Sequence, residues 1–581
     1  MIKIPDENRK ITQNNQSDIL GHLWSSWNLD LASNLGKFRI SPRTLLVTDS
    51  TDVSDFGTPV AFKFFDAKWW AVCGTQVFGN GGVPKSNYTT DSSTGAQTDY
   101  SADESDLEVF NGALYSTTTD ALAKKASSGT GTGSWSLNGS ALNPGTPHLL
   151  CSFNSRLYVT DLKTQIKSIN TSDTMVTSGS GFIDLGNADV NTLSFMRASS
   201  DRIWIGVINR AHGKAIIYEW DGVSANVRKA YLLEAPGAMA CVIKNDVPWV
   251  LDSNGTLLVW QGGAFIEKAR LPIRDKFLFN YTSVDSGERF IHPNGMAVIN
   301  NEIHLFIKNT IGDDGNTVIE RLPSGVWAYN ETNGLYHKYS LSLHREISGS
   351  VTDYGQVRIN KAGALADAKT YSTAANDDGR FLVGAQFFSD ATTTASGIFI
   401  DNSNDTKQKY GYFVTSKILS PNITEHWQRL LVRFRKFLTS TDKIIVKYRV
   451  LEETATELAT ITWVDTDTFT TATDVSGNVG DEVEILQGTG AGGCAHITSV
   501  TGSAPYTVNL DETFTGVTTG TAKARVQSWV KAGSYSGQTK NWEKFSLEKK
   551  EPWIQLKICL LWTGKNEIDD IMLLHLPHLK E

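Results

Sequence analysis

A repeat of about 45 residues constrains this chain most strongly. Each unit has a loop of Asn, Asp, Ser or Gly, then a short apolar strand rich in aromatic residues, then another polar turn. The units centre on Trp69, Leu114, Leu157, Ile203, Val247 and Ile303. The steps between these centres are 45, 43, 46, 44 and 56 residues. A unit of this length is typical of a four-stranded blade of a β-propeller.

Several units end in a hairpin signal, in which an aromatic strand runs into a Gly-rich turn at Trp220, Trp260 or Trp327. One blade cannot bury its own faces, so blades pack around a common axis. We therefore expect residues 51–412 to form a six- or seven-bladed β-propeller, with a weaker seventh unit around Val357. Non-repeating β-sandwiches are the alternative, and the six similar spacings favour the propeller.

The rest of the chain has a different pattern. Residues 1–50 are partly extended and apolar and are expected to pack on the propeller or to close its ring, whereas a free arm gripping a neighbouring subunit is the alternative. The stretches "RLLVRFRKF" and "KIIVKYRVLEE" predict paired long strands of a β-sandwich made of residues 413–462 and 526–581. Residues 463–525 are rich in Thr and Gly and predict a small β-barrel-like module inserted into that sandwich. The predicted fold class is all-β.

A glycine motif inside that module raises the question of nucleotide binding. Gly488, Gly490 and Gly493 follow a strand-like run in the pattern G-x-G-x-x-G. A dinucleotide turn must open a helix, whose N-terminal amides hold the pyrophosphate. Here β-branched residues follow, and Pro505 would break a helix. The stretch therefore predicts a glycine-rich hairpin, and no cofactor is expected.

Charge and cysteine content exclude further classes. The formal net charge is -8, which argues against a nucleic-acid partner. The five Cys residues are scattered without a C-x-x-C spacing, so we expect buried reduced thiols and neither a zinc site nor a disulfide framework. The N-terminal stretch has no apolar signal region and no run reaches 18 apolar residues, so we expect synthesis in a cytoplasm and no membrane span.

Two stretches contain part of a metal-binding or catalytic motif. "DNSND" (401–405) alternates oxygen ligands as calcium loops do, but it lacks their Gly and closing Glu. "SVTDYGQV" (350–357) faintly resembles the hairpin of sialidase blades, with the spacing shifted and the Trp missing. We therefore predict no metal site, no catalytic residue and no enzymatic activity.

One basic face is predicted in the C-terminal domain. Arg433, Arg435, Lys447 and Arg449 alternate with apolar residues on the two strand-like runs, and strand residues two apart share a face. The plain interpretation is a solvated face, and the sharper one is contact with an acidic neighbour. Together with Trp24 and Trp27 in the N-terminal stretch, these four residues are the predicted partner contacts.

Two stretches resemble structural proteins of tailed bacteriophages. Residues 28–78 are similar to the N-terminal region of tail-associated ones. Residues 479–516 resemble small β modules of phage tail and fibre proteins, through a shared G-D-x-V-x-I run, a glycine hairpin and two further strands. The matching residues are Gly480, Asp481, Val483, Ile485, Gly488, Gly490, Gly492, Ile497, Val500, Thr507, Val508, Leu510 and Asp511.

The resemblance implies a non-enzymatic structural component of a virion, most simply in the tail, made in the host cytoplasm. Its implied partners are other virion proteins and further copies of itself in a symmetric assembly. Two alternatives stay open. One is a receptor- or glycan-binding protein of a tail tip or fibre, and the other is a propeller glycosidase acting on host surface polysaccharide.

Overall fold

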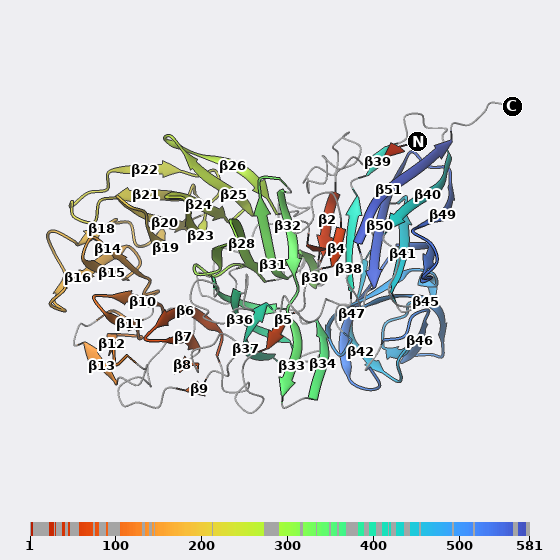
Figure 1. Cartoon of the computed structure of the whole chain (residues 1–581), viewed down its shortest axis with the longest axis horizontal. Coiled ribbons are helices and arrows are strands. Elements are labelled where there is room, and N and C mark those ends of the chain that lie inside the picture. Colours follow the sequence, from red (N-terminus) through yellow and green to blue (C-terminus); the bar gives the residue numbers. More distant parts are fainter. Residues whose placement is uncertain are drawn as a thin grey trace.

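The regular secondary structure of the computed structural model is almost entirely β-strand among the described residues (Figure 1), which confirms the all-β prediction. The structure describes residues 2–3, 23–27, 29–30, 38–40, 44–46, 57–73, 76–80, 89–90, 105–129, 134–138, 142–144, 146–211, 213–271, 290–308, 310–313, 318–322, 324–332, 334–347, 350–356, 359–367, 381–388, 394–401, 410–415, 417–419, 426–434, 442–451, 455–490, 493–514, 517–561 and 567–576. The one helical element among them is the 3-10 turn η3 (Ser476–Asn478).

Seven antiparallel sheets make up the larger part of the molecule, and in each the strands pair mostly in chain order. The first is β6 (Pro59–Phe65), β7 (Lys68–Cys73), β8 (Gln76–Gly79) and β9 (Thr89–Thr90). The second is β10 (Leu107–Phe110), β11 (Ala113–Thr117), β12 (Leu122–Ala126) and β13 (Trp135–Asn138). The third is β14 (Leu150–Phe153), β15 (Arg156–Asp161), β16 (Gln165–Ile169) and β17 (Met175–Val176), with β18 (Ile183–Asp184) also on β16.

The next three sheets repeat this plan. The fourth is β19 (Asn191–Ala198), β20 (Ile203–Asn209), β21 (Ile216–Trp220) and β22 (Lys229–Leu232). The fifth is β23 (Ala238–Lys244), β24 (Val247–Asp252), β25 (Thr256–Gln261) and β26 (Ala264–Arg270). The sixth is β27 (Met296–Ile299), β28 (Glu302–Ile307), β31 (Gly325–Asn330) and β32 (Gly334–Tyr339), with the hairpin β29 (Thr310–Asp313) and β30 (Val318–Leu322) between its second and third strands.

The seventh sheet joins the two ends of this region. It consists of β35 (Ile359–Asp367), β36 (Phe381–Phe388), β37 (Thr394–Asp401) and, from the N-terminal stretch, β5 (Thr44–Leu46). Leu46 pairs with Phe399 and is buried against the neighbouring sheet. The hairpin β33 (Ser342–Ile347) and β34 (Ser350–Gln356) precedes this sheet. The predicted seventh unit centre, Val357, lies outside the described residues, and the second strand of this sheet is β36.

The seven sheets stand in a closed ring (Figure 1). Their first strands contact one another in the order β6, β10, β14, β19, β23, β27, β35 and back to β6. A buried apolar cluster lies between every pair of neighbouring sheets. Each sheet therefore buries both faces on its neighbours, as stacked repeats must.

Turn chemistry explains why the repeat is visible in the sequence. In five of the sheets the turn between the first two strands has two residues in succession with positive φ, the backbone of a type I′ hairpin turn. These pairs are Asp66–Ala67, Asn111–Gly112, Asn154–Ser155, Asn245–Asp246 and Asn300–Asn301. Asn, Asp and Gly tolerate this conformation best. All six predicted unit centres fall at or near the start of the strand that follows such a turn or loop.

The C-terminal region contains two six-stranded sheets. The outer sheet holds β3 (Leu29–Asp30), β4 (Phe38–Ile40), β51 (Glu567–Leu576), β40 (His426–Phe434) and β49 (Trp542–Lys549), with β1 (Ile2–Lys3) on β51. The central sheet holds β2 (Leu23–Trp27), β38 (Tyr410–Thr415), β50 (Trp553–Leu561), β41 (Lys443–Arg449) and β48 (Val530–Tyr535), with β39 (Ile418–Leu419) on β50. One apolar core, which includes Trp427, Val446 and Ile558, draws side chains from both sheets.

A closed six-stranded barrel lies beside the central sheet (Figure 1). Its strands are β42 (Ala455–Trp463), β43 (Thr468–Thr471), β46 (Tyr506–Leu510), β45 (Cys494–Thr501), β44 (Glu482–Gly488) and β47 (Thr521–Gln527). The barrel strands thus extend beyond residues 463–525 at both ends. β44 and β45 pair antiparallel, so the glycine motif connects two strands of a hairpin as expected.

The predicted pairing of the two basic strands is wrong. β40 pairs with β49 and β51 in the outer sheet, whereas β41 pairs with β48 and β50 in the central sheet. From Ile444 to Arg449 every side chain of β41 is buried. One face of this strand packs in the core between the two sheets, and the other faces the barrel.

Candidate functional sites

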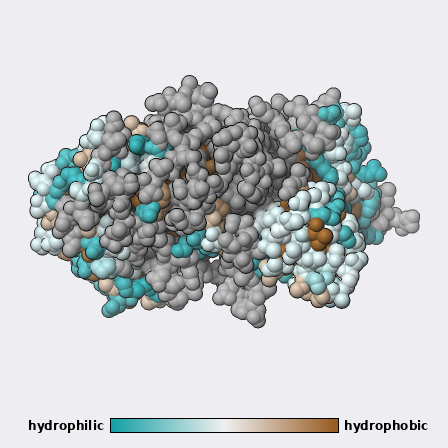
Figure 2. Space-filling view, turned by 90° about the horizontal axis from the view of Figure 1, so that it is seen from below, coloured by the Kyte–Doolittle hydropathy of each residue, from teal (hydrophilic) through white to brown (hydrophobic). Residues whose placement is uncertain are grey.

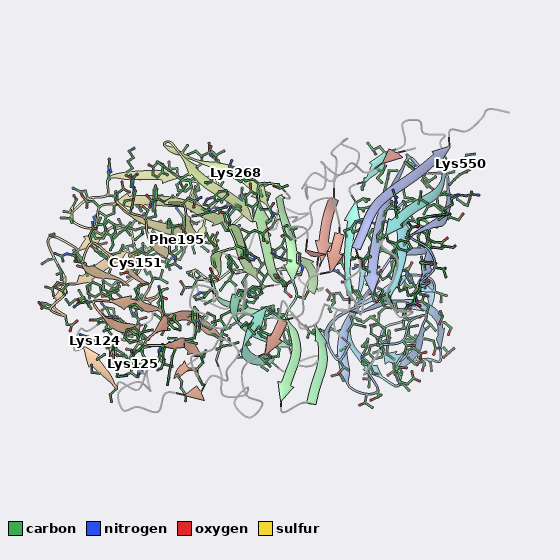
Figure 3. All side chains as sticks on the ribbon, in the orientation of Figure 1. Lys124, Lys125, Cys151, Phe195, Lys268 and Lys550 are labelled. Atoms are coloured by element: carbon green, nitrogen blue, oxygen red, sulfur yellow. The ribbon has the colours of Figure 1, made fainter. Side chains whose placement is uncertain are left out.

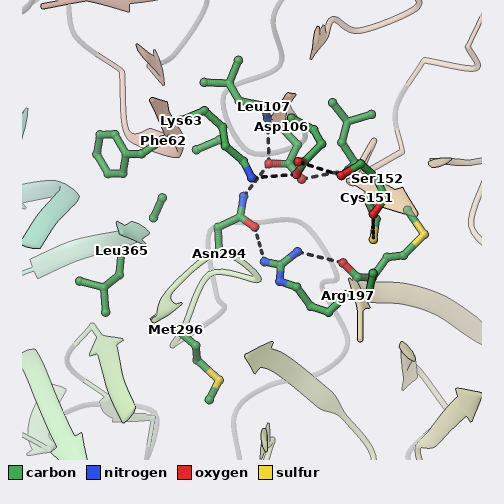
Figure 4. Close-up of a pocket in the computed structure, with 16 residues that line it drawn as sticks. Phe62, Lys63, Asp106, Leu107, Cys151, Ser152, Arg197, Asn294, Met296 and Leu365 are labelled. Atoms are coloured by element: carbon green, nitrogen blue, oxygen red, sulfur yellow. Dashed lines mark hydrogen bonds and ion pairs between the residues drawn. The ribbon is translucent and has the colours of Figure 1, made fainter. Parts of the chain in front are cut away.

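A cavity of about 300 Å³ lies where the first strands of the ring converge, and we call it the axial cavity (Figure 4). Six of the seven sheets contribute to its lining. Charged and polar side chains share the wall with apolar ones. The charged and polar ones include Lys63, Glu108, Ser152, Arg197 and Asn294, and the apolar ones include Met296.

Asn294, just before β27, connects several sheets at this cavity (Figure 4). Its Nδ2 donates to the carbonyl of Val60 at 3.0 Å and to Oδ1 of Asp106 at 2.9 Å. Its Oδ1 accepts from the guanidinium of Arg197 at 2.5 Å. Arg197 also donates to the carbonyl of Pro293 at 3.1 Å. One side-chain amide thus joins the first, second, fourth and sixth sheets.

Asp106 is buried at the start of the second sheet. Besides Asn294, the backbone N–H groups of Leu107 and Leu150 donate to its carboxylate, each at 2.9 Å. Burial raises the pKa of Asp106, and the charge of Arg197 and these backbone N–H groups oppose that rise. The carboxylate is committed to structural hydrogen bonds and therefore holds neighbouring sheets together.

Lys63 and Glu108 form an ion pair on the cavity wall, with 2.9 Å between Nζ and Oε2. Ser152 donates to the other carboxylate oxygen at 3.2 Å. Burial opposes the charge of Lys63, but the carboxylate of Glu108 holds the pKa of Lys63 above its ordinary value. The Lys63 side chain is 36% exposed, so a solute can reach this pair.

The axial cavity has the size and the mixed lining of a small-ligand site. Its volume is at the lower end of the usual range for ligand sites, and such sites combine apolar walls with a few fixed polar groups. Both carboxylates of the lining, Asp106 and Glu108, have hydrogen-bond or ion-pair partners. Lys63, Ser152 and Arg197 offer donors, and Glu108 offers acceptors.

A second concentration of charge lies between the central sheet and the barrel, and we call it the barrel–sheet interface. Lys447 and Lys557 project from adjacent strands of the sheet onto Glu482 of the barrel, and all three side chains are buried. Lys557 Nζ lies 2.5 Å from Oε1 of Glu482, and Lys447 bonds Oε2. Burial favours protonation of Glu482, but the two ammonium groups hold its pKa well below the ordinary value.

Aromatic rings and further ion pairs complete this interface. Lys557 Nζ lies 4.2 Å from the ring centroid of Tyr412, and the guanidinium of Arg449 lies 4.5 Å from the ring of Trp529. These distances are those of cation–π contacts. Arg449 Nε also donates to Gln555 at 2.8 Å. Nearer the edge, Lys443 pairs with Glu512, Lys531 with Asp511 and Glu512, and Arg525 with Glu484.

The predicted contact residues fall in different places. The solvent-facing position expected for Lys447 and Arg449 is wrong, because they are 0% and 4% exposed and face the chain's own barrel. Arg433 is exposed on the outer sheet. Arg435 and the side chains of Trp24 and Trp27 lie outside the described part of the chain, although the backbone of β2 pairs with β38.

For two further predicted absences, a metal site and a membrane span, the structure gives information only on the described residues. Within the described ranges, no three His, Cys, Asp or Glu side chains gather closely enough to hold a metal ion. Most of the "DNSND" stretch lies outside those ranges. No helix in the described residues is long and apolar enough to cross a membrane.

Neither site was predicted. The interface had a readable signal, because Lys447 and Arg449 alternate on one strand as Glu482 and Glu484 do on another, and the flanking residues of both strands are apolar. Such paired alternation of opposite charges fits two strands that face each other. The axial cavity had no signal of this kind, since Lys63, Glu108, Arg197 and Asn294 are far apart in sequence.

No protein-family model matches the sequence, and no curated protein matches it. Solved structures with some likeness include the extracellular domain of a one-component system from B. thetaiotaomicron, at 11% identity and a TM-score of 0.37 over 75% of this chain and 46% of that chain. Raptor from Chaetomium thermophilum gives 10% and 0.36 over 63% and 30%, and the designed protein Ika8 gives 9% and 0.33 over 61% and 99%. This chain thus spans less than half of the first two. Likenesses this low carry no argument about function.

Proposed function

We propose that this chain is a non-enzymatic structural component of a bacteriophage virion, associated with the tail and made in the host cytoplasm. It assembles by protein–protein contacts, in several copies and with other virion proteins. The observation that supports this most is the seating of residues 479–516. The described strands of this phage-like stretch, β44, β45 and β46, belong to the barrel, which Glu482 joins to the central sheet through two buried lysines.

We infer further that the seven sheets form a seven-bladed β-propeller and that the two six-stranded sheets form a β-sandwich. The closed ring of first strands supports the propeller, as do the seven clusters between neighbouring sheets. The apolar core shared by the outer and central sheets supports the sandwich. In this arrangement β5 closes the ring from the N-terminal side, which gives a rigid unit suited to an assembly.

The described surface agrees with a protein that meets its partners through scattered contacts. In the view of Figure 2 the coloured surface is mainly hydrophilic, with apolar side chains singly or in small groups. Among the described residues, Trp542 is 43% exposed on β49 and Leu232 is 68% exposed on β22. Single exposed apolar residues of this kind are common on protein surfaces.

Protein mass spectrometry of gradient-purified particles from the source of the sequence tests the proposal. We expect peptides of this chain in a constant ratio to the other structural proteins across the particle peak. Peptides that appear only in the soluble fraction would contradict a virion role.

A second candidate is glycan binding at the axial cavity, favoured by its mixture of donors, acceptors and apolar walls. Lys63 and Arg197 suit an acidic sugar, and Ser152 and Glu108 suit hydroxyl groups. Calorimetric titration with acidic and neutral oligosaccharides tests this. Binding that is lost in Lys63→Met and kept in the control Lys268→Met, on the outer strand β26 (Figure 3), would favour it. No binding by the wild-type chain would exclude it for the sugars titrated.

A further inference from the structure

Two cysteines lie in one buried cluster at the barrel–sheet interface. Cys494 opens β45 of the barrel, and Cys559 lies on β50 of the central sheet, two residues after Lys557. Both are buried in one cluster with Tyr412, Ile445 and Trp529. Burial and the neighbouring Cys559 raise the pKa of the Cys494 thiol.

The surroundings of this pair favour thiolate chemistry. Lys447 Nζ lies 3.1 Å from Sγ of Cys494. Burial alone would raise the pKa of Cys559, but the hydrogen bond from Cys494 and the ammonium groups of Lys447 and Lys557 lower it to about 7. The thiolate is the reactive form of cysteine, and neighbouring cations stabilise it.

The other three cysteines lack this arrangement. Cys73, Cys151 and Cys241 are buried in sheets of the ring, and burial raises the pKa of each. They therefore remain protonated at neutral pH. Cys559 therefore differs from these three cysteines, because its pKa is lowered and theirs are raised.

We propose that Cys494 and Cys559 are a latent disulfide site, which closes under peroxide and covalently joins the barrel to the central sheet. The Cys559 thiolate attacks one oxygen of hydrogen peroxide, the O–O bond breaks, and a sulfenic acid forms as hydroxide leaves. Cys494 then attacks the sulfenic sulfur and gives up its proton, so the S–S bond forms, the S–O bond breaks and water leaves. Two thiols lose two electrons and two protons, and one peroxide becomes two water molecules.

This site goes beyond the proposed function and does not depend on it. The chain folds with reduced thiols, as in a cytoplasm, and the bond forms after the barrel is seated. Once formed, it prevents the barrel from separating from the sheet. The two cysteines belong to elements that the ion pairs of Glu482 already hold in contact.

Peptide mapping of the folded full-length chain, with and without stoichiometric hydrogen peroxide, tests the proposal. We expect one cross-linked peptide joining Cys494 to Cys559 and a fall in free thiols from five by two. The same cross-link is expected in the control Cys241→Ser. In Cys494→Ser it is absent, and Cys559 oxidises to sulfinic acid instead.

A second variant tests the role of the lysine. Replacing Lys447 with methionine removes one cation beside Cys494 and Cys559. The pH at which the cross-linking rate reaches half of its maximum should therefore move upward. Near-ultraviolet circular dichroism shows whether each variant is folded. The proposal is overturned if the folded wild-type chain keeps five free thiols after oxidation, or if Cys494 and Cys559 oxidise without joining each other.

Discussion

Lys557 and Glu482 form a buried ion pair, with 2.5 Å between Nζ and Oε1, that crosses from the central sheet to the barrel. Neither side chain has appreciable contact with water. Separating the two groups would leave an unpaired charge in a low-dielectric interior. The pair therefore holds the barrel against the central sheet. The position of the barrel on the sheet is therefore set by a small number of charged groups.

Removing the central carboxylate tests this relationship. Glu482→Gln leaves Lys447 and Lys557 buried without a counter-charge, and we expect a loss of about 3–5 kcal/mol in the free energy of unfolding. Urea titration followed by tryptophan fluorescence measures it, since Trp529 lies at the interface. The control Glu543→Gln, at an exposed ion pair with Lys540, should leave the midpoint unchanged. Equal midpoints for both variants would show that the buried pair is unimportant.

Acid should weaken the same interface. Burial raises the pKa of Asp511, but hydrogen bonds from His496 and Lys531 outweigh burial and bring it well below the ordinary value, as the lysines do for Glu482. A lowered carboxyl pKa stabilises the fold above the unfolded pKa of about 4 and loses that contribution as the pH falls. We therefore expect the urea midpoint to fall from pH 5 to pH 3. A smaller fall is expected in Asp511→Asn, and a midpoint that rises would contradict the assignment.

His337 makes the stability of the fold depend on pH in a separate range. Burial lowers its pKa to about 4, against an unfolded value of about 6.5. Its neutral ring stabilises the fold above pH 6.5, and this contribution is lost as the pH falls toward 4. His337→Gln should flatten the urea midpoint between pH 6.5 and pH 5 relative to wild type. An unchanged slope in that range would mean that His337 is not held neutral.

The Asn294 amide should matter more than an ordinary polar side chain. Asn294→Ala removes its bonds to Asp106, Val60 and Arg197, and leaving such groups unpaired costs about 1–3 kcal/mol. Thermal denaturation measures the change. Lys268→Ala, on the exposed outer strand β26, is the control and should stay within about 0.5 kcal/mol of wild type. Equal melting temperatures for the two variants would show that the Asn294 amide does not help to hold the sheets of the ring together.

The glycine motif of the barrel is a packing requirement. A Cβ on Gly493 would come within 2.2 Å of the ring of Phe514, so we expect Gly493→Ala to cost about 1–3 kcal/mol through overpacking. Gly477→Ala is the matched control in the same barrel, because nothing lies within 4 Å of its added Cβ. Urea titration compares them. A Gly493 variant as stable as the control would show that the ring of Phe514 yields.

How much the sequence predicts depends on the range of the interactions. The hairpin turns at Asn111, Asn154 and Asn245 are local, so their recurrence marked the strands that follow. The closure of the seventh sheet is not local. β5 pairs with β37 from the other end of the region, and a search for a period along the chain cannot detect such a pairing.

The charged sites show the same limit. Alternation of Lys447 and Arg449 with apolar residues predicts one polar face, but it does not say whether that face meets water or protein. The answer lies in Glu482, 35 residues from Lys447 and in a separate barrel. Asp106 and Asn294 are 188 residues apart. These contacts follow from the packing of whole sheets, which the local pattern does not specify.

Immunogold electron microscopy of intact particles tests the proposed virion role of this chain. Antibodies against the purified chain are applied to intact particles from the source of the sequence. We expect gold on the tail, and the position of the gold would separate a connector from a receptor-binding tip. The proposed virion role would be contradicted if antibodies that bind the purified chain label neither intact nor opened particles. That result would favour a soluble glycan-binding protein.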